Sequence, residues 1–158
     1  MNITRAISSS FALGPATIAA LVLLASASAS AQSAEPAHVA IVGADYAFVQ
    51  LPATLAPGPT LFSFENRGTK RHEMSIVLLN PRVAPDTLLA SKPGSLTGRA
   101  VSDSIIGLLL ARPGERGGGQ LYANLISGRT YVVICTLKDS PDARPHVELG
   151  MVGTFRVR

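Results

Sequence analysis

The sequence predicts a two-sheet β-sandwich in a single domain, and three observations favour this fold class. Six or more short strand-like runs are separated by turn signals, which is the pattern of an all-β sandwich. The chain has 158 residues, which suits one domain, and 47% of them are hydrophobic, enough to fill one core. Only 15% are charged, too few for a disordered acidic or basic tail.

The expected strands are short runs rich in β-branched, aromatic and aliphatic residues. In chain order they are residues 39–42, 46–49, 60–66, 74–79, 120–125, 130–134 and 152–157. A stretch with three prolines, from Leu51 to Pro59, interrupts the first part of the series. Met74–Leu79 is a near-continuous apolar run, which indicates a buried strand, and Thr130–Ile134 is the strongest strand signal in the chain.

Residues 84–119 are expected to form an insertion that contains one or two short helices. The segments 85–90 and 102–110 each begin with polar residues and continue with clustered apolar ones, and Ser102 or Asp103 is a candidate helix N-cap. Three consecutive glycines, 117–119, follow. A phosphate-binding loop also needs a Lys-Ser/Thr pair, which is missing here, so we interpret the glycines as a mobile turn.

Residues 1–31 have the pattern of a cleaved signal peptide. A single charge at Arg5 precedes an apolar stretch from Phe11 to Leu24, and Ala29-Ser30-Ala31 fits a small-residue cleavage site. A helix that spans a bilayer needs about 20 apolar residues, so an uncleaved anchor is the weaker alternative. We therefore expect residues 32–158 to form the mature domain, in the periplasm or otherwise exported, with no stable membrane insertion.

The chain has one cysteine, Cys135, which excludes a disulfide framework and a zinc site of the paired-cysteine type. Because most cysteines of exported proteins are oxidised in pairs, a lone thiol needs a reason, and a metal would supply one. The formal charge is +4 without a clustered basic stripe, so a nucleic-acid partner is not expected.

Four residues with metal-binding side chains fall at the ends of expected strands. His72 precedes the run 74–79, Cys135 follows 130–134, and His146 and Met151 lie before 152–157. Strand ends can meet at one pole of a sandwich, where functional loops usually lie. One thiolate and two imidazoles in a plane, with a weak axial thioether, form the ligand set of a type 1 (blue) copper site. Zinc prefers more cysteine or a carboxylate, and calcium and magnesium prefer oxygen.

Three segments resemble the cupredoxin family, which comprises plastocyanin-like type 1 blue-copper proteins. In residues 125–135 a turn glycine and a tyrosine precede the cysteine, as in the family's approach to the copper thiolate. Residues 145–153 place a histidine, a glycine and a methionine close together, and residues 64–72 are similar to the family's strand, Asn-containing turn and first histidine ligand. The resemblance covers roughly residues 60–80 and 120–158. It implies a Greek-key β-sandwich with one type 1 copper held by His72, Cys135, His146 and Met151.

Three features differ from the plastocyanin pattern. Ten residues separate Cys135 from His146, which places residues 139–144 beside the metal. The family usually has an asparagine after the first histidine, whereas this chain has Glu73, which we expect to be a solvated side chain. An ionised carboxylate cannot donate a hydrogen bond to the thiolate, so Asn66 is the candidate for a supporting role behind the ligands. The insertion at 84–119 lies outside the resemblance.

Four protein ligands leave no coordination position for a substrate, which favours electron transfer over catalysis. Copper oxidases that resemble this fold need further histidines beside the cysteine, but Ile134 and Thr136 flank Cys135. We therefore expect an exported monomer, not an enzyme, that cycles between Cu(I) and Cu(II) and exchanges electrons with redox proteins. A basic rim of Lys70, Arg71 and Arg144 would favour partners with acidic docking surfaces.

Two other functions remain open. One is copper binding or delivery, for which Met74 is a candidate ligand because it would share a strand face with His72. The other is a metal-free cupredoxin-like module for protein interaction. Taken singly, Cys135 and Met151 are also common core residues, and we interpret His38, which fits no ligand position, as structural.

Overall fold

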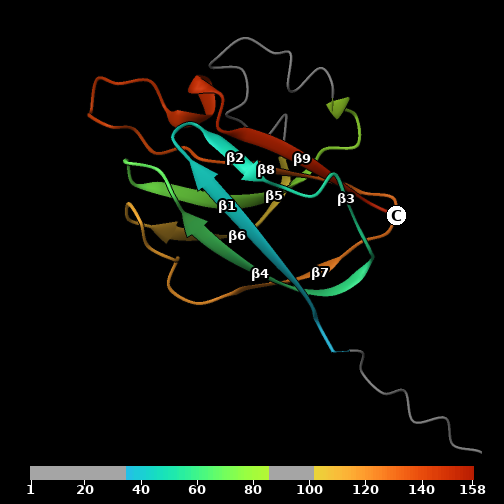
Figure 1. Ribbon diagram of the computed structural model, residues 1–158. Helices are drawn as coiled ribbons and strands as arrows, with labels where there is room; N and C mark the ends of the chain where they lie inside the picture. Colours follow the sequence, from blue (N-terminus) through green and yellow to red (C-terminus); the bar gives the residue numbers. More distant parts are fainter. Residues whose placement is uncertain (1–34, 86–101) are drawn as a thin grey trace, which may run out of the picture. The chain divides into compact units, whose positions relative to one another are not determined.

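Nine strands in residues 35–85 and 102–158, the part of the chain that the computed structural model describes, form a β-sandwich (Figure 1). One sheet has the strand order β2-β1-β4-β7 and the other β3-β9-β8-β5-β6. In chain order the strands are β1 (Ala37–Ala44), β2 (Ala47–Gln50), β3 (Thr54–Leu55), β4 (Gly58–Asn66), β5 (His72–Leu79), β6 (Ser102–Ala111), β7 (Leu121–Leu125), β8 (Thr130–Ile134) and β9 (Val152–Val157). The all-β prediction is thus confirmed.

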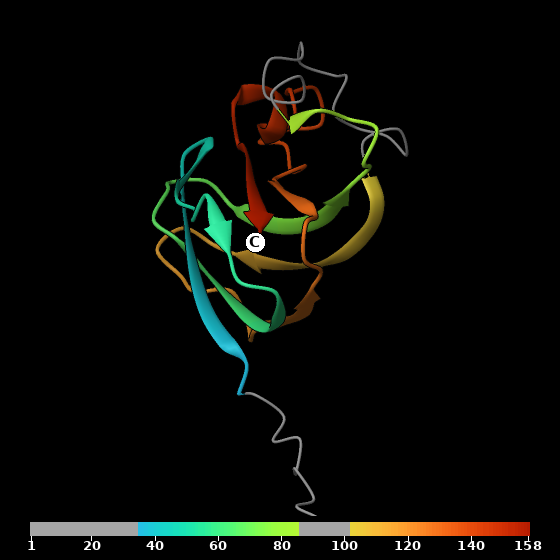
Figure 2. The same ribbon diagram turned by 90° about the vertical axis from the view of Figure 1, so that its right-hand side faces the viewer.

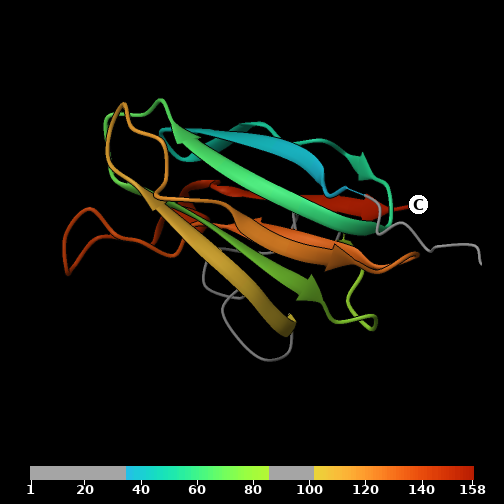
Figure 3. The ribbon, with the colours of Figure 1, turned by 90° about the horizontal axis from the view of Figure 1, so that it is seen from below.

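The hydrophobic core lies between the two sheets, with β1 and β4 in one layer and β5 and β6 in the other (Figure 3). Along β4 every second residue from Thr60 to Asn66 is buried, which is the alternation of a strand with one face in the core. Phe62 of β4 meets Phe155 of β9 across the sandwich at 5.8 Å, and Phe155 stacks on Tyr131 of β8 at 5.1 Å. These aromatic side chains join the two layers.

The strongest sequence signals gave the best strand predictions. The predicted runs 130–134 and 152–157 have the same bounds as β8 and β9, and all eight residues of β5 are buried, as the apolar run indicated. Both faces of β5 are covered: Met74, Ile76 and Leu78 lie in the main core cluster, whereas Val77 and Leu79 pack in a second cluster with Val132 and Val147. The prediction at 46–49 is displaced by one residue in β2, since Asp45 and Tyr46 form the turn after β1. The two-residue strand β3, inside the proline-rich stretch, was not predicted.

The predicted helix over 102–110 is wrong, because these residues form strand β6 at the edge of the second sheet. β6 runs antiparallel beside β5 (Figure 2). Its register with β5 shifts twice, so that Ile106 and Asp103 lack a direct partner, and such bulges break the strict alternation expected of a strand. Apolar residues lie on both faces of β6, since Leu108 and Leu110 are exposed and Leu109 is buried, which explains the clustered apolar pattern. The candidate N-caps Ser102 and Asp103 are strand residues.

Some of the predictions lie outside the described residues. These are the signal peptide at 1–31 and, apart from Pro85, the possible helix at 85–90. The described residues include the short 3-10 helix η1 (His146–Leu149), and no helix among them is long and apolar enough to cross a bilayer.

Three connecting segments meet at one end of the sandwich. They are the turn between β1 and β2, the loop of residues 67–71 before β5, and η1 with the loop that precedes it (left in Figure 1). Hydrogen bonds join them: the Thr69 N–H donates to Asp45 Oδ1, and the Tyr46 hydroxyl donates to Asp139 Oδ2. The predicted ligand residues lie at this end.

Candidate metal centre

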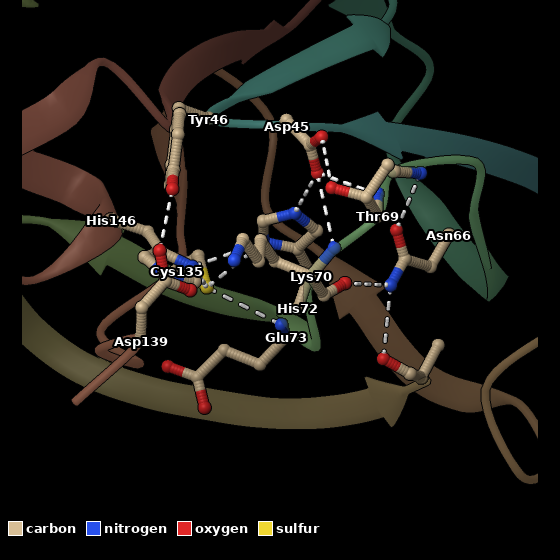
Figure 4. Close-up of polar contacts among 12 residues, drawn as sticks. Asp45, Tyr46, Asn66, Thr69, Lys70, His72, Glu73, Cys135, Asp139 and His146 are labelled. Atoms are coloured by element: carbon tan, nitrogen blue, oxygen red, sulfur yellow. Dashed lines mark hydrogen bonds and ion pairs between the residues drawn. The ribbon is translucent and has the colours of Figure 1, made fainter. Parts of the chain in front are cut away.

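Three predicted ligands converge from three elements. His72 is the first residue of β5, Cys135 follows β8, and His146 is the first residue of η1. All three side chains are fully buried. The two imidazole Nδ1 atoms lie 3.0 Å apart, and Cys135 Sγ lies 3.4 Å from Nδ1 of His146 and 3.9 Å from Nδ1 of His72 (Figure 4). The structure therefore brings together the two nitrogens and the sulfur that the sequence predicted.

The triangle of donor atoms has the size of a metal site. A triangle with sides of 3.0, 3.4 and 3.9 Å has a circumradius of about 2 Å, close to the ~2.0–2.3 Å of metal bonds to imidazole nitrogen and thiolate sulfur. One ion in the plane of the three atoms can thus contact all of them. The donor set of two imidazoles and one thiolate in a plane is the one that type 1 copper uses.

Backbone hydrogen bonds place His146 beside Cys135 although a long loop separates them. The Val147 N–H donates to the Cys135 carbonyl at 2.7 Å, and the His146 N–H donates to the Leu137 carbonyl at 2.8 Å. Gly150 ends η1 at φ 114°, a left-handed conformation that favours glycine. The loop thus leaves β8 and returns to it, so its length does not separate the ligands.

Met151, the fourth predicted ligand, is fully buried, and its main chain is hydrogen-bonded to two of the other three. Its N–H donates to the His146 carbonyl at 3.0 Å, and its carbonyl accepts from the Cys135 N–H at 3.2 Å. Its side chain reaches towards β1, since a Cβ added to Gly43 would lie 3.0 Å from the Met151 methyl carbon. Axial coordination by the Met151 thioether remains a prediction.

The sulfur of Cys135 sits among main-chain donors. The Glu73 N–H donates to Sγ at 3.4 Å. Burial raises the pKa of the Cys135 thiol, while the backbone N–H groups of Glu73 and Leu137 act in the opposite direction. In the absence of a positive ion the thiol is therefore protonated. A bound metal would displace this proton, and the two amides are in place to stabilise the thiolate.

The prediction that Glu73 is solvated is wrong, because its side chain is only 6% exposed. Glu73 Oε1 accepts hydrogen bonds from both the N–H and the hydroxyl of Thr136, each at 2.7 Å. The carboxylate therefore fixes the residue that follows Cys135. Because β5 and β8 are neighbours, these groups meet although 63 residues separate them in sequence.

Asn66 supports the loop before His72 and directs its amide away from the sulfur. Its Nδ2 donates to the carbonyls of Lys70 and Ala111 at 2.7 and 3.1 Å, and its Oδ1 accepts from the Gly68 N–H at 2.9 Å. These bonds use both amide hydrogens. The hydrogen-bond donors to Cys135 are thus main-chain groups, whereas Asn66 shapes the turn from which His72 emerges.

Two carboxylates bind the outer nitrogens of the histidines. Asp45 Oδ1 lies 3.3 Å from His72 Nε2, and Asp139 Oδ1 lies 3.2 Å from His146 Nε2. A carboxylate at Nε2 favours the tautomer with hydrogen on that atom, so both Nδ1 lone pairs face the same point. Two such lone pairs only 3.0 Å apart repel each other unless a metal ion or a shared proton lies between them, so the arrangement suits a metal site.

Both carboxylates are held in their ionised form. The Thr69 hydroxyl, together with bonds from His72 and the N–H groups of Thr69 and Lys70, lowers the pKa of Asp45 to about 2. The hydrogen bond from Tyr46 lowers the pKa of Asp139, and the same bond raises the pKa of Tyr46. Burial lowers the pKa of His72, although Asp45 opposes this effect, so burial favours a neutral His72 ring.

Sequence reasoning placed Asp139 beside the metal within the loop 139–144, but it missed Asp45 and Tyr46. The tyrosine ring meets the His146 ring edge-on at 5.1 Å and the His72 ring at 6.2 Å. The position of Asp45 and Tyr46 in a two-residue turn between strands does not indicate a metal site. The one available hint was an aromatic residue at a turn position.

The remaining candidates are not among the three donors. Met74 is fully buried in the hydrophobic core cluster, and His38 is exposed on β1 with Nδ1 3.5 Å from Gln120 Nε2. Lys70 and Arg71 are exposed next to His72. Arg144 is also exposed, but it pairs with Glu148 four residues along the chain.

Comparison with known proteins supports the fold. No protein-family model and no curated protein sequence matches the chain. Among solved structures, dithionite-reduced auracyanin from Roseiflexus castenholzii is 20% identical, with a TM-score of 0.51 over 77% of this chain and 96% of its own. The chain shares the cupredoxin fold. Auracyanin A, a "blue" copper protein from Chloroflexus aurantiacus, gives 20% identity and a TM-score of 0.51 over 78% of this chain and 100% of its own. Auracyanin B is 22% identical, with a TM-score of 0.53 over 78% of this chain and 91% of its own.

Proposed function

We propose that this protein is an exported carrier of single electrons that works through one type 1 copper ion. The observation that supports the proposal most directly is the buried triangle of His72 Nδ1, His146 Nδ1 and Cys135 Sγ. Its donor types and its size both suit copper. Met151, whose main chain is bonded to both Cys135 and His146, is the proposed axial ligand.

The protein's own residues supply a rigid, dry set of ligands. When bound, copper would supply the one-electron change between Cu(II) and Cu(I). The main-chain amide of Glu73 supports the sulfur, and Asp45 and Asp139 orient the two imidazoles. Because all three donors are buried and held by hydrogen bonds, they favour similar positions in both oxidation states, which lowers the reorganisation needed for electron transfer.

The same burial favours a carrier over an enzyme. A copper enzyme needs an open coordination position or a path for substrate to the metal. In this chain both histidine ligands and the cysteine are 0% exposed, and the Tyr46 ring lies against both imidazoles.

Visible absorption and electron paramagnetic resonance spectra test the proposal. Purified protein is loaded with Cu(II) beside the Cys135→Ser variant, and Tyr122→Phe on the exposed side of β7 serves as a control. We expect an intense thiolate-to-copper band with narrow hyperfine splitting, which Cys135→Ser removes and the control keeps. A colourless wild-type protein, or a spectrum unchanged by Cys135→Ser, would refute the type 1 site.

Exposed basic residues next to the site are expected to steer electron partners. Lys70 and Arg71 directly precede His72, whereas Arg144 is paired with Glu148 and contributes less. At low salt, Lys70→Glu with Arg71→Glu should slow electron exchange with anionic hexacyanoferrate and speed exchange with cationic hexaammineruthenium. Arg156→Glu with Arg158→Glu, exposed residues at the C-terminal end, is the matched control in stopped-flow measurements. Equal effects of the two pairs would argue against steering at this rim.

A further inference from the structure

We propose that the turn Asp45–Tyr46 and the loop residue Asp139 form a clasp that holds both imidazole ligands and slows the exchange of metal with solvent. This inference rests on the proposed copper function and deepens it. Asp45, Tyr46 and Asp139 are positioning residues, because each acts on the metal through a histidine ring. The name clasp refers below to these three residues.

The clasp is a continuous path of contacts from one imidazole to the other (Figure 4). His72 Nε2 lies 3.3 Å from Asp45 Oδ1, and Tyr46 is the next residue in the turn. The Tyr46 hydroxyl donates to Asp139 Oδ2 at 2.5 Å, and Asp139 Oδ1 lies 3.2 Å from His146 Nε2. Two adjacent residues of one turn therefore control the outer nitrogens of both rings, one directly and one through Asp139.

The clasp also joins the two layers of the sandwich. Its turn connects β1 and β2 of the first sheet, whereas His72 begins β5 of the second sheet and His146 follows β8. The Tyr46 ring packs edge-on against His146 and His72, with interplanar angles of 74° and 86°. Release of the metal requires an imidazole to move, and this ring stands against both of them.

Asp45 is itself anchored. Its carboxylate accepts hydrogen bonds from the N–H and hydroxyl of Thr69, both at 2.7 Å, and from the Lys70 N–H at 3.2 Å. The turn is thus fastened to the loop that leads into His72. A fastened carboxylate restrains an imidazole more strongly than a freely rotating one.

The backbone of Tyr46 indicates that its side chain is retained for a purpose. Its φ of 59° lies in the left-handed region, and Tyr46 is the one non-glycine residue there in the described part of the chain. Glycine would suit this turn position better than an aromatic residue. Strained residues of this kind cluster at functional sites, where the surrounding contacts hold them in place.

The strain allows a clean test, because Tyr46→Gly removes the ring and the hydroxyl but relieves the backbone. Copper-loaded wild type, Tyr46→Gly and Tyr46→Phe are mixed with excess EDTA, and the loss of the visible band is timed. We expect Tyr46→Gly to lose copper about 10–100-fold faster, the usual range for residues that support metal ligands, without a lower melting temperature of the metal-free protein. Tyr46→Phe keeps the aromatic ring over the imidazoles and loses one hydrogen bond. Its rate of copper loss should therefore lie between those of wild type and Tyr46→Gly.

Tyr122→Phe is the matched control, since it removes a hydroxyl from an exposed tyrosine on β7. It should leave the release rate unchanged. Equal release from Tyr46→Gly and wild type would overturn the clasp even if the blue spectrum establishes the copper site. A loss of thermal stability in Tyr46→Gly that accounts for the faster release would also overturn it, because the turn would then be merely structural.

A metal-free readout separates this proposal from the function on which it rests. In the wild-type protein without metal, nuclear magnetic resonance should show the Nε2-bound protons of His72 and His146 protected from exchange with water. Tyr46→Gly should make the Nε2-bound proton of His146 exchange with water at least about tenfold faster, and Tyr122→Phe should leave this rate unchanged. If wild type binds no copper, the proposed function fails, and this comparison still decides the clasp: equal exchange in wild type and Tyr46→Gly would reject it.

Discussion

At the scale of single residues, the ligand positions are explained by chemistry and their supports by contacts distant in sequence. A histidine, a cysteine and a methionine at strand ends indicate a copper site, because few other roles need that combination. The residue type of Glu73 does not predict its role. A carboxylate next to a ligand is usually solvated, yet this one is buried against Thr136. Its function depends on which strand becomes its neighbour.

Replacing Glu73 tests its role as a buried acceptor. Glu73→Ala leaves the Thr136 N–H and hydroxyl without their partner, which should cost about 1–3 kcal/mol in the free energy of unfolding. Glu73→Gln keeps an acceptor oxygen and should lose less. Urea unfolding of the metal-free variants measures the difference. Equal stability of the alanine and glutamine variants would show that the acceptor contributes little.

Gly68 is required at its position because of close contacts. An added Cβ would clash with the Asp45 carboxylate and would lie 3.0 Å from the Asp45 backbone nitrogen and 3.1 Å from His72 Nε2. Gly68→Ala should therefore displace Asp45 from His72 and destabilise the metal-free protein by about 1–3 kcal/mol. Gly118→Ala, where an added Cβ meets nothing within 4 Å, is the control in thermal unfolding. An unchanged stability of Gly68→Ala in thermal unfolding would mean that the loop adapts to the added methyl group.

The sequence indicated the three donor residues that the fold brings together, but not the residues that hold them. Asp45 is 27 residues from His72, and Tyr46 is 93 residues from Asp139. Both contacts exist only after one sheet packs on the other. A pattern read along the chain has no access to that packing.

At the scale of elements, the regularity of strand pairing separates the predictions that succeeded from the one that failed. The strands β8 and β9 have regular pairing, and the sequence predicted their bounds. β6 has a shifted register, and the sequence analysis interpreted it as a helix. The prediction rested on clustered apolar residues, and β6 has them because its exposed face carries Leu108 and Leu110 beside the buried Leu109.

Neighbouring leucines on β6 test the alternation of buried and exposed side chains along this strand. Leu109 is 8% exposed and belongs to the core cluster, whereas Leu108 is 49% exposed. Leu109→Ala should therefore cost about 2–4 kcal/mol in the free energy of unfolding, and Leu108→Ala within about 0.5 kcal/mol. Denaturant unfolding of the two single variants checks this. Similar losses at both positions would contradict the alternation.

At the scale of the whole molecule, the fold follows from patterns that are insensitive to local detail. A single core, seven predicted runs that each overlap a strand and the turns between them were enough to predict a sandwich, even with one strand misassigned and a two-residue strand missed. The meeting of the ligands at one end was predictable for the same reason, since they lie at strand ends. The sheet order that positions Asp45 and Tyr46 was not predictable in this way.

Metal binding should stabilise the entire sandwich, because the three donors come from β5, the end of β8 and η1. A ligand that binds only the folded state adds about 2.7 kcal/mol at 100 times its dissociation constant. For a domain of this size that corresponds to a rise of roughly 10 °C in melting temperature. Scanning calorimetry with and without Cu(II) measures the rise, and a chelator should reverse it.

The variant Cys135→Ser decides whether that rise comes from the proposed site. The serine is close in size to the buried cysteine, so the metal-free variant should melt near the metal-free wild type. Without the thiolate, the three-donor triangle is incomplete, and most of the copper-dependent rise should disappear. Exposed histidine such as His38 is unchanged in the variant and accounts for any weak residual binding. An equal rise in both proteins would place the stabilising copper outside the triangle, and the ligand assignment would then be wrong.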